Sequence, residues 1–136
     1  MEKQHLSNEQ VGVWIDHKEA FAIVNDEANQ TIEHIVSNME KHTHYSGHAI
    51  AGEGLAEDHR DRQFATHLNL YYDDVISHIK NATSIYIFGP GEAKTELKKR
   101  FERISTNGKV VGFETAEKLT MPQMVDKVHA FFRKQN

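Results

Sequence analysis

The turn at residues 88–94 contains residue types that could bind an anion. It reads Phe-Gly-Pro-Gly-Glu-Ala-Lys and joins a predicted strand to a predicted helix start, where free backbone N–H groups attract phosphate. The basic residues on or beside this helix form the densest basic cluster of the chain: Lys94, Lys98, Lys99, Arg100 and Arg103. With Gly89 and Gly91, they predict a contact with RNA or another anion. Because the turn lacks both the G-x-G-x-x-G and the G-x-x-x-x-G-K-S/T pattern, a tight turn before a solvated helix face is the alternative.

A second chemistry that the sequence offers is metal-dependent cleavage of a phosphodiester. Asp16 follows the first predicted strand, Glu57 and Asp58 lie at the start of the long predicted helix, and Glu92 lies in the glycine turn. Nucleases of this kind need several carboxylates that converge on two divalent ions. The predicted strand at 84–88 contains no acidic residue, which leaves the carboxylate set incomplete. An ordinary turn aspartate is the alternative for Asp16.

Three neighbouring histidines could ligate a metal ion. His42, His44 and His48 form an H-x-H-x-x-x-H pattern, and imidazole is a common ligand of zinc, copper and nickel. The surrounding segment, residues 37–55, is rich in glycine and lacks apolar periodicity, which predicts a mobile loop. Such a loop offers no rigid element to fix three rings around one ion. We expect no cofactor beyond an adventitious divalent metal, and a histidine-loop metal or pH sensor stays open as an alternative.

Alternating strands and helices are predicted to position these residues. Three short apolar runs separated by polar turns indicate an antiparallel meander, and apolar residues at helical spacing follow the loop. The predicted strands are 11–15, 20–24, 31–36, 84–88 and 109–113, and the predicted helices are a long one ending near 79, one at 92–104 and one from 120. The predicted apolar helix faces comprise Phe64, Leu68, Tyr71, Val75 and Ile79, then Ala93, Leu97, Phe101 and Ile104, and finally Val125, Val128 and Phe132.

The resulting order, βββαβαβα, is that of the ribonuclease H-like fold. Strands that alternate with helices pair in parallel through crossovers, so an α/β architecture with a mixed five-stranded sheet and helices on its faces is expected. A length of 136 residues suits one domain, and we assign the whole chain, residues 1–136, to it.

The formal charge of −4 argues against a general nucleic-acid binder. It comes from 16 Lys and Arg against 20 Asp and Glu, with ten histidines counted as neutral. Any RNA contact must therefore use a local basic patch, and no DNA partner is expected. The absence of cysteine excludes disulfide frameworks, thiolate zinc sites and cysteine nucleophiles. The polar first ten residues and the lack of an apolar run near the roughly 20 residues that span a bilayer predict a cytoplasmic protein without a membrane partner.

Several motifs together resemble a known family. Residues 13–20, Val-Trp-Ile-Asp-His-Lys-Glu-Ala, resemble the V-x-x-D-x-x-E-A opening of the middle domain of archaeal and eukaryotic class I peptide-chain release factors and of pelota. The turn at 87–94 resembles the G-P-G-x-x-K turn of that domain, and the helix that includes residues 61–65 resembles its long helix. Over roughly residues 10–134 the chain is most similar to bacterial stand-alone relatives of this domain, often labelled translational machinery proteins, which share the histidine-rich loop and an ending like residues 111–115.

The loop before the long helix departs from the release factors. Their loop carries Gly-Gly-Gln, which enters the peptidyl transferase centre, whereas the loop here contains Gly47, His48, Gly52 and Gly54 but neither a Gly-Gly pair nor glutamine. Peptidyl-tRNA hydrolysis by that route is therefore not expected. Pelota also lacks Gly-Gly-Gln and acts in rescue of stalled ribosomes without hydrolysis. The resemblance implies a non-enzymatic translation-associated module that binds ribosome or RNA, in ribosome rescue or translational control, with its oligomeric state left open.

Overall fold

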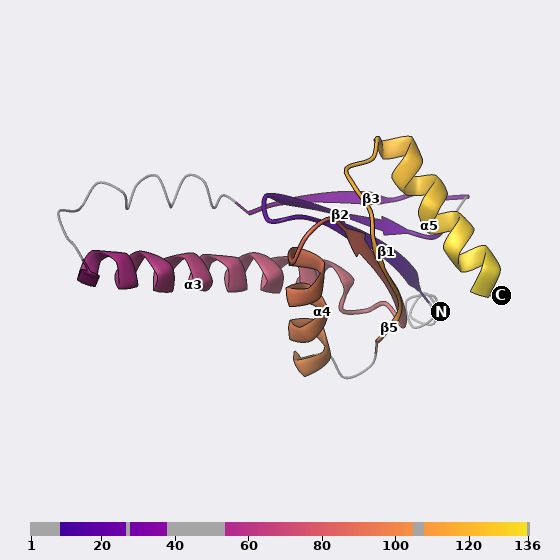
Figure 1. The fold of residues 1–136 in the computed structure, drawn as a ribbon. Coiled ribbons are helices and arrows are strands. Elements are labelled where there is room, and N and C mark those ends of the chain that lie inside the picture. The colour runs from indigo at the N-terminus through magenta and orange to yellow at the C-terminus, as the bar shows by residue number, and fades with distance from the viewer. Residues whose placement is uncertain (1–8, 27, 38–53, 105–107, 136) are drawn as a thin grey trace.

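A five-stranded mixed sheet forms the centre of the domain, with strand order β3-β2-β1-β4-β5 (Figure 1). The computed structural model describes residues 9–26, 28–37, 54–104 and 108–135. The strands are β1 (Gln10–Ile15), β2 (Glu19–Val24), β3 (Ile32–Val36), β4 (Ser84–Gly89) and β5 (Lys109–Thr115), and the helices are α3 (Gly54–Ile79), α4 (Ala93–Ile104) and α5 (Met121–Gln135). The first three strands pair antiparallel, and β1, β4 and β5 pair in parallel. This confirms the predicted ribonuclease H-like α/β fold and its element order.

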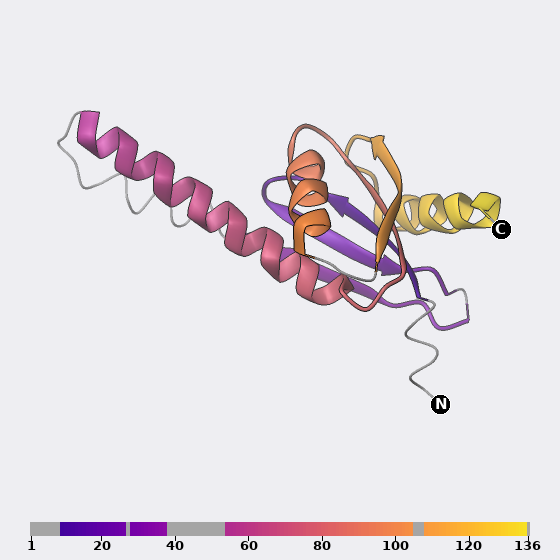
Figure 2. The ribbon, with the colours of Figure 1, turned by 90° about the horizontal axis from the view of Figure 1, so that it is seen from below.

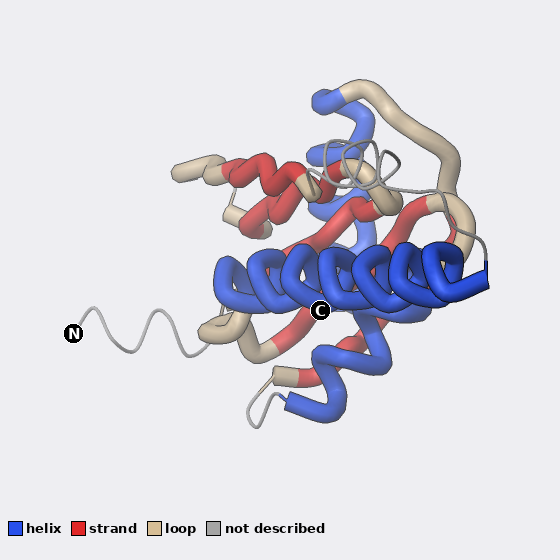
Figure 3. The backbone as a smooth tube through the Cα atoms, turned by 90° about the vertical axis from the view of Figure 1, so that its left-hand side faces the viewer, coloured by secondary structure: helices blue, strands red, loops and turns tan. Residues whose placement is uncertain are grey.

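Helices cover the sheet on both faces, so the central strands are buried on both sides. Helices α3 and α4 pack on one face and α5 packs on the other (Figures 1 and 3). Toward α3 and α4 point Val11, Val13, Ile15, Ile85 and Ile87, and toward α5 point Trp14, Tyr86 and Phe88. Because both sides of β1 and β4 are covered, these strands are continuous apolar runs rather than alternating ones.

Gly12 allows α5 to lie directly on β1. A Cβ atom at Gly12 would lie only 2.3 Å from Cγ2 of Val128, a side chain of α5 that is fully buried. Such a separation is far inside van der Waals contact, which is about 3.5–4.0 Å between carbon atoms. The missing side chain at Gly12 therefore sets how closely the last helix approaches the sheet.

Two residues predicted to be buried are exposed. Phe64 lies on the expected face of α3 but is 44% exposed. The first part of α3 extends beyond the sheet (Figure 2). Ile104 is the last residue of α4 and is 49% exposed. In α5 the fully buried position is Met124, whereas Val125 is only half-buried.

Element boundaries also differ slightly from the prediction. Gly54 is the first residue of α3, so it belongs to the helix rather than to the predicted loop. The rest of that loop from residue 38 onward, including Gly47, His48, Gly52, His42 and His44, lies outside the described residues. Helix α4 begins at Ala93, one residue later than predicted, and β5 continues to Thr115. Within the described ranges, no helix has the length and apolar character needed to cross a membrane.

Replacing Gly12 by alanine should destabilise the fold, because the added Cβ overlaps Val128. We expect Gly12→Ala to lower the free energy of unfolding by about 1–3 kcal/mol, the usual cost of overpacking a core. Val128→Ala alone should cost about 2 kcal/mol through the cavity that it leaves. The double variant should be more stable than the sum of both losses implies, since alanine at 128 makes room for the new Cβ. Urea denaturation of the four proteins measures this coupling, and strictly additive losses would contradict the proposed contact.

Candidate functional site

The predicted anion-binding turn lies where the carboxyl ends of β1 and β4 meet. The chain leaves β1 toward β2 and leaves β4 toward β5, so the two connections diverge at this point. Ligands of open α/β sheets bind preferentially at such a switch point. A Cβ atom at Gly89 would lie 2.2 Å from the carbonyl oxygen of Ile15, so only glycine lets the end of β4 come this close to β1. Strand pairing thus holds the turn and the start of α4 in place.

Lys94 stabilises the turn from inside the fold. Its side chain is only 7% exposed, and its Nζ donates a hydrogen bond to the carbonyl oxygen of Gly91 at 2.7 Å. The same ammonium lies 5.8 Å from the centroid of the Phe113 ring, within the range of a cation–π contact. Gly91 itself has φ +62°, a left-handed conformation that glycine adopts easily. Lys94 is therefore engaged by the turn and by β5, apart from the exposed basic residues of α4.

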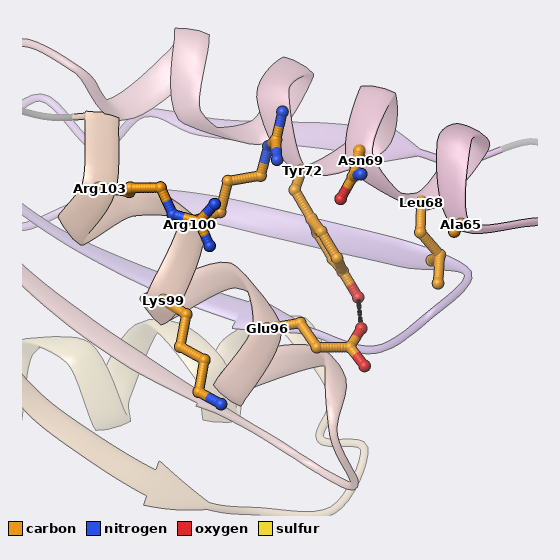
Figure 4. A pocket seen from close by; sticks show the side chains of 8 residues that line it. All are labelled: Ala65, Leu68, Asn69, Tyr72, Glu96, Lys99, Arg100 and Arg103. Carbon is orange, nitrogen blue, oxygen red and sulfur yellow. Dashed lines mark hydrogen bonds between the residues drawn. The ribbon is translucent and has the colours of Figure 1, made fainter. Parts of the chain in front are cut away.

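A groove with a volume of about 310 Å³ runs between α3 and α4 (Figure 4). Its walls are formed by Ala65, Leu68, Asn69 and Tyr72 of α3 and by Glu96, Lys99, Arg100 and Arg103 of α4. The α3 wall is mostly apolar or neutral, whereas the α4 wall carries three of the predicted basic residues. The groove is thus the place where the basic cluster of α4 meets a concave surface.

The basic residues of α4 differ in how far their charges are already compensated. Arg100 donates from Nε and Nη2 to the two carboxylate oxygens of Asp73, at 2.6 and 3.1 Å, a bidentate pair that joins α4 to α3. Lys98 pairs with Glu102 at 3.1 Å. Lys99 and Arg103 are exposed and form no ion pair with any described residue. These two cations remain open to a ligand in the groove.

A buried tyrosine and a carboxylate also line the groove. The hydroxyl of Tyr72 donates to Oε1 of Glu96 (Figure 4). Nε2 of His17 lies 3.4 Å from the same oxygen. Burial, together with the hydrogen bond to Glu96, raises the pKa of Tyr72 far above its ordinary value. The phenol therefore remains protonated and holds the Glu96 carboxylate in position. An anion in the groove would be attracted by Lys99 and Arg103 and repelled by Glu96.

The carboxylates predicted for the nuclease alternative do not form a metal site in the described structure. Oδ1 of Asp16 accepts hydrogen bonds from the backbone N–H groups of Lys18 and Glu19, at 2.8 and 2.9 Å, which stabilise the turn into β2. Glu92 is exposed in the turn before α4. Glu57 and Asp58 lie in α3, but their side chains are outside the described part. Among the described residues, no group of three His, Asp or Glu side chains is arranged to hold a metal ion.

Sequence reasoning did not identify Tyr72 and Glu96, which line the groove, or Asp73, which holds Arg100. Tyr72, Glu96 and Asp73 come from two helices, and their contacts join positions 24 and 27 residues apart in the chain. One available signal was the Tyr71-Tyr72 pair, because two successive aromatic residues cannot both point in the same direction from one helix. The hydroxyl of Tyr71 bonds to the carbonyl oxygen of Asp16 at 2.8 Å, whereas Tyr72 faces α4.

Comparison with known proteins identifies a similar fold. No family model and no curated protein matches the sequence. The crystal structure of the Thermoplasma acidophilum Pelota protein matches 85% of this chain with a TM-score of 0.55 and 19% sequence identity, and the matched part is 30% of that chain. A second solved structure, an archaeal protein, has a TM-score of 0.40 and 13% identity over 95% of this chain and 40% of that one, too distant for a comparison of folds. The chain thus shares its fold with part of Pelota and spans about a third of that protein's length.

The buried tyrosines predict a loss of stability in alkaline solution. The folded state holds the pKa of Tyr72 above that of the unfolded chain, so the unfolded state releases this proton first. The stabilisation is complete below pH about 10 and is lost as the pH rises above it. As the pH rises from 10 to 11, the free energy of unfolding should fall by about 1 kcal/mol less in Tyr72→Phe than in the unsubstituted chain. Denaturation curves at both pH values test this, and equal losses in the two proteins would contradict it.

Proposed function

We propose that the protein is a non-enzymatic, translation-associated module that contacts RNA, most simply ribosomal RNA, through the groove between α3 and α4. The observation that carries the proposal is that Lys99 and Arg103 are exposed on one wall of this groove, without an ion pair to any described residue. The shared fold with part of Pelota supports a role in translation. Ribosome rescue and translational control are the two settings that the proposal covers.

The spacing of the two cations suits a nucleic-acid strand. Lys99 and Arg103 are four positions apart in α4, which places them about 6 Å apart along the helix axis. They can therefore contact neighbouring phosphates of one strand, while Arg100, held by Asp73, keeps α4 fixed against α3. Glu96, three positions before Lys99 on the same wall, repels phosphate and so would favour a strand that passes nearer Arg103.

Because the chain is negatively charged overall, the proposed contact depends on where the nucleic acid meets the protein surface. With a net charge of −4, the protein has no general attraction for nucleic acid, and binding requires that the phosphates reach the α4 wall. Affinity supplied by phosphate contacts falls as salt rises, because bound counterions are released from the nucleic acid. A steep dependence on salt is therefore the signature of the proposed mode.

Reversing the two groove charges should abolish most of the binding. We expect the double variant Lys99→Glu/Arg103→Glu to bind ribosomal RNA at least tenfold more weakly at low salt and to lose cosedimentation with ribosomes. The slope of log K against log salt should become shallower by about 1.4, since two contacts to a single strand are lost. Filter binding over a salt series and sedimentation through a sucrose cushion are the measurements.

The matched control is Lys80→Glu/Lys134→Glu, which makes the same change in net charge at two exposed positions outside the groove. This control should bind like the unsubstituted protein. Equal weakening in both double variants would show that overall charge, not the groove, is responsible. If the unsubstituted protein binds neither ribosomes nor ribosomal RNA at low salt, including in lysates with stalled ribosomes, the proposed function is wrong.

A further inference from the structure

Strand β3 is an edge of the sheet whose outer side pairs with no other described strand. In the ladder to β2, the N–H of Val24 bonds to the carbonyl of Thr31 at 3.0 Å, and the N–H of Ser37 bonds to the carbonyl of Lys18 at 2.9 Å. Because the bonded residues of an antiparallel pair alternate, positions 31, 33, 35 and 37 face β2. The N–H and C=O groups of Ile32, His34 and Val36 therefore point away from the sheet.

The side chains of these three residues are also exposed, all on the α5 face of the sheet. Ile32 is 37% exposed, Val36 is 50% exposed, and the side chain of His34 is 47% exposed. Helix α5 packs against β1 and leaves this part of the face open. The opposite face of β3 is covered by α3, where Ile35 is buried and Glu33 bonds to His78. One edge thus presents free backbone groups together with two aliphatic side chains.

The centre of this edge is held in a fixed conformation. The ring of His34 stacks on Phe21 with centroids 4.5 Å apart and planes 6° from parallel. Its Nε2 lies 2.8 Å from Oε1 of Glu19, and the other oxygen of that carboxylate accepts from Lys118. Edges that must stay unpaired usually contain Lys or Pro, and the sequence Ile-Glu-His-Ile-Val of β3 contains neither. Within the described residues the edge is therefore ordered and paired with no other strand on its outer side.

We infer that β3 pairs antiparallel with β3 of a second copy of this chain, around a two-fold axis at His34. In this register Ile32 lies opposite Val36 of the partner subunit, so that the two exposed aliphatic residues cover each other on both sides of the axis. Each of the three free residues then faces another free residue and exchanges both backbone hydrogen bonds with it. The two sheets of five strands become one continuous sheet.

This register is favoured by the residues themselves. An axis at Ile32 or at Val36 would leave part of each free edge beyond the end of the other strand, whereas the axis at His34 uses all three free residues of both copies. It also sets Glu33 opposite Ile35 of the partner subunit, so no carboxylate faces a carboxylate. An isologous contact of this kind is the form that most dimers take. The interface is small, so we expect association that depends strongly on concentration.

Mass measurement over a concentration series tests the pairing. Sedimentation equilibrium from low micromolar to about 1 mM chain should show the mass rising from 15.6 kDa toward twice that value. Ile32→Lys/Val36→Lys should remain at the mass of one chain, because the introduced lysines of the two copies would lie directly opposite each other across the paired edge, where like charges repel. The matched control Leu70→Lys/Ile104→Lys replaces two exposed aliphatic residues on α3 and α4 and should still associate.

A cysteine substitution tests the register, because the chain has no cysteine of its own. His34→Cys should form a disulfide-linked dimer on mild oxidation, since directly opposed residues of a bonded pair have Cα atoms about 5.5 Å apart. Glu33→Cys should not form this disulfide, because in the proposed register position 33 lies opposite Ile35 of the partner subunit and not opposite position 33. The inference is overturned if the unsubstituted protein keeps the mass of one chain throughout, if the double lysine variant still associates, or if Glu33→Cys crosslinks as readily as His34→Cys.

Discussion

The parallel pairing of β1 with β4 is the constraint on which the rest of the structure depends. It sets Val11 beside Ile85 and Val13 beside Ile87, and it buries both strands on both faces. Strands β3 and β4 run in the same direction with β2 and β1 between them, so the chain must cross over the sheet from one to the other, and α3 lies in that crossover. The same pairing brings Gly89 against Ile15 and thereby places the start of α4. The groove between α3 and α4 is a consequence of how two strands pair.

The strands and their order could be predicted because each strand is a short apolar run between polar turns, and the alternation of strands and helices leaves few topologies. The helices were predicted less completely. Apolar periodicity indicates which face of a helix is apolar, but it does not indicate whether another element covers that face. Phe64 continues the apolar face of α3 but is 44% exposed, and the first part of α3 extends beyond the end of the sheet (Figure 2). The length of the sheet, not the helix sequence, decides that outcome.

The basic cluster could be located from the sequence, but its division into structural and available charges could not. Lys94 and Lys98 are one turn apart in the same helix, yet Lys94 is buried against the glycine turn and Lys98 pairs along the helix with Glu102. Arg100 is compensated by Asp73, 27 residues earlier in the chain, and this contact exists only because α4 packs on α3. Which cations remain available follows from tertiary contacts, and among the described residues Lys99 and Arg103 are the exposed members of the cluster without an ion pair.

The two surfaces proposed to bind partners, the groove and the β3 edge, are separated by α3. This helix contacts β2 and β3, whereas α4 contacts β1, β4 and β5. The groove therefore opens on the side of α3 away from the β3 edge, and pairing of two edges would leave each groove uncovered. In a two-fold dimer the two grooves would lie on the same face of the continuous sheet, because an axis perpendicular to a sheet preserves its faces. A dimer would then present two basic walls to one partner, and the local concentration of the second groove would strengthen binding beyond what either groove achieves alone.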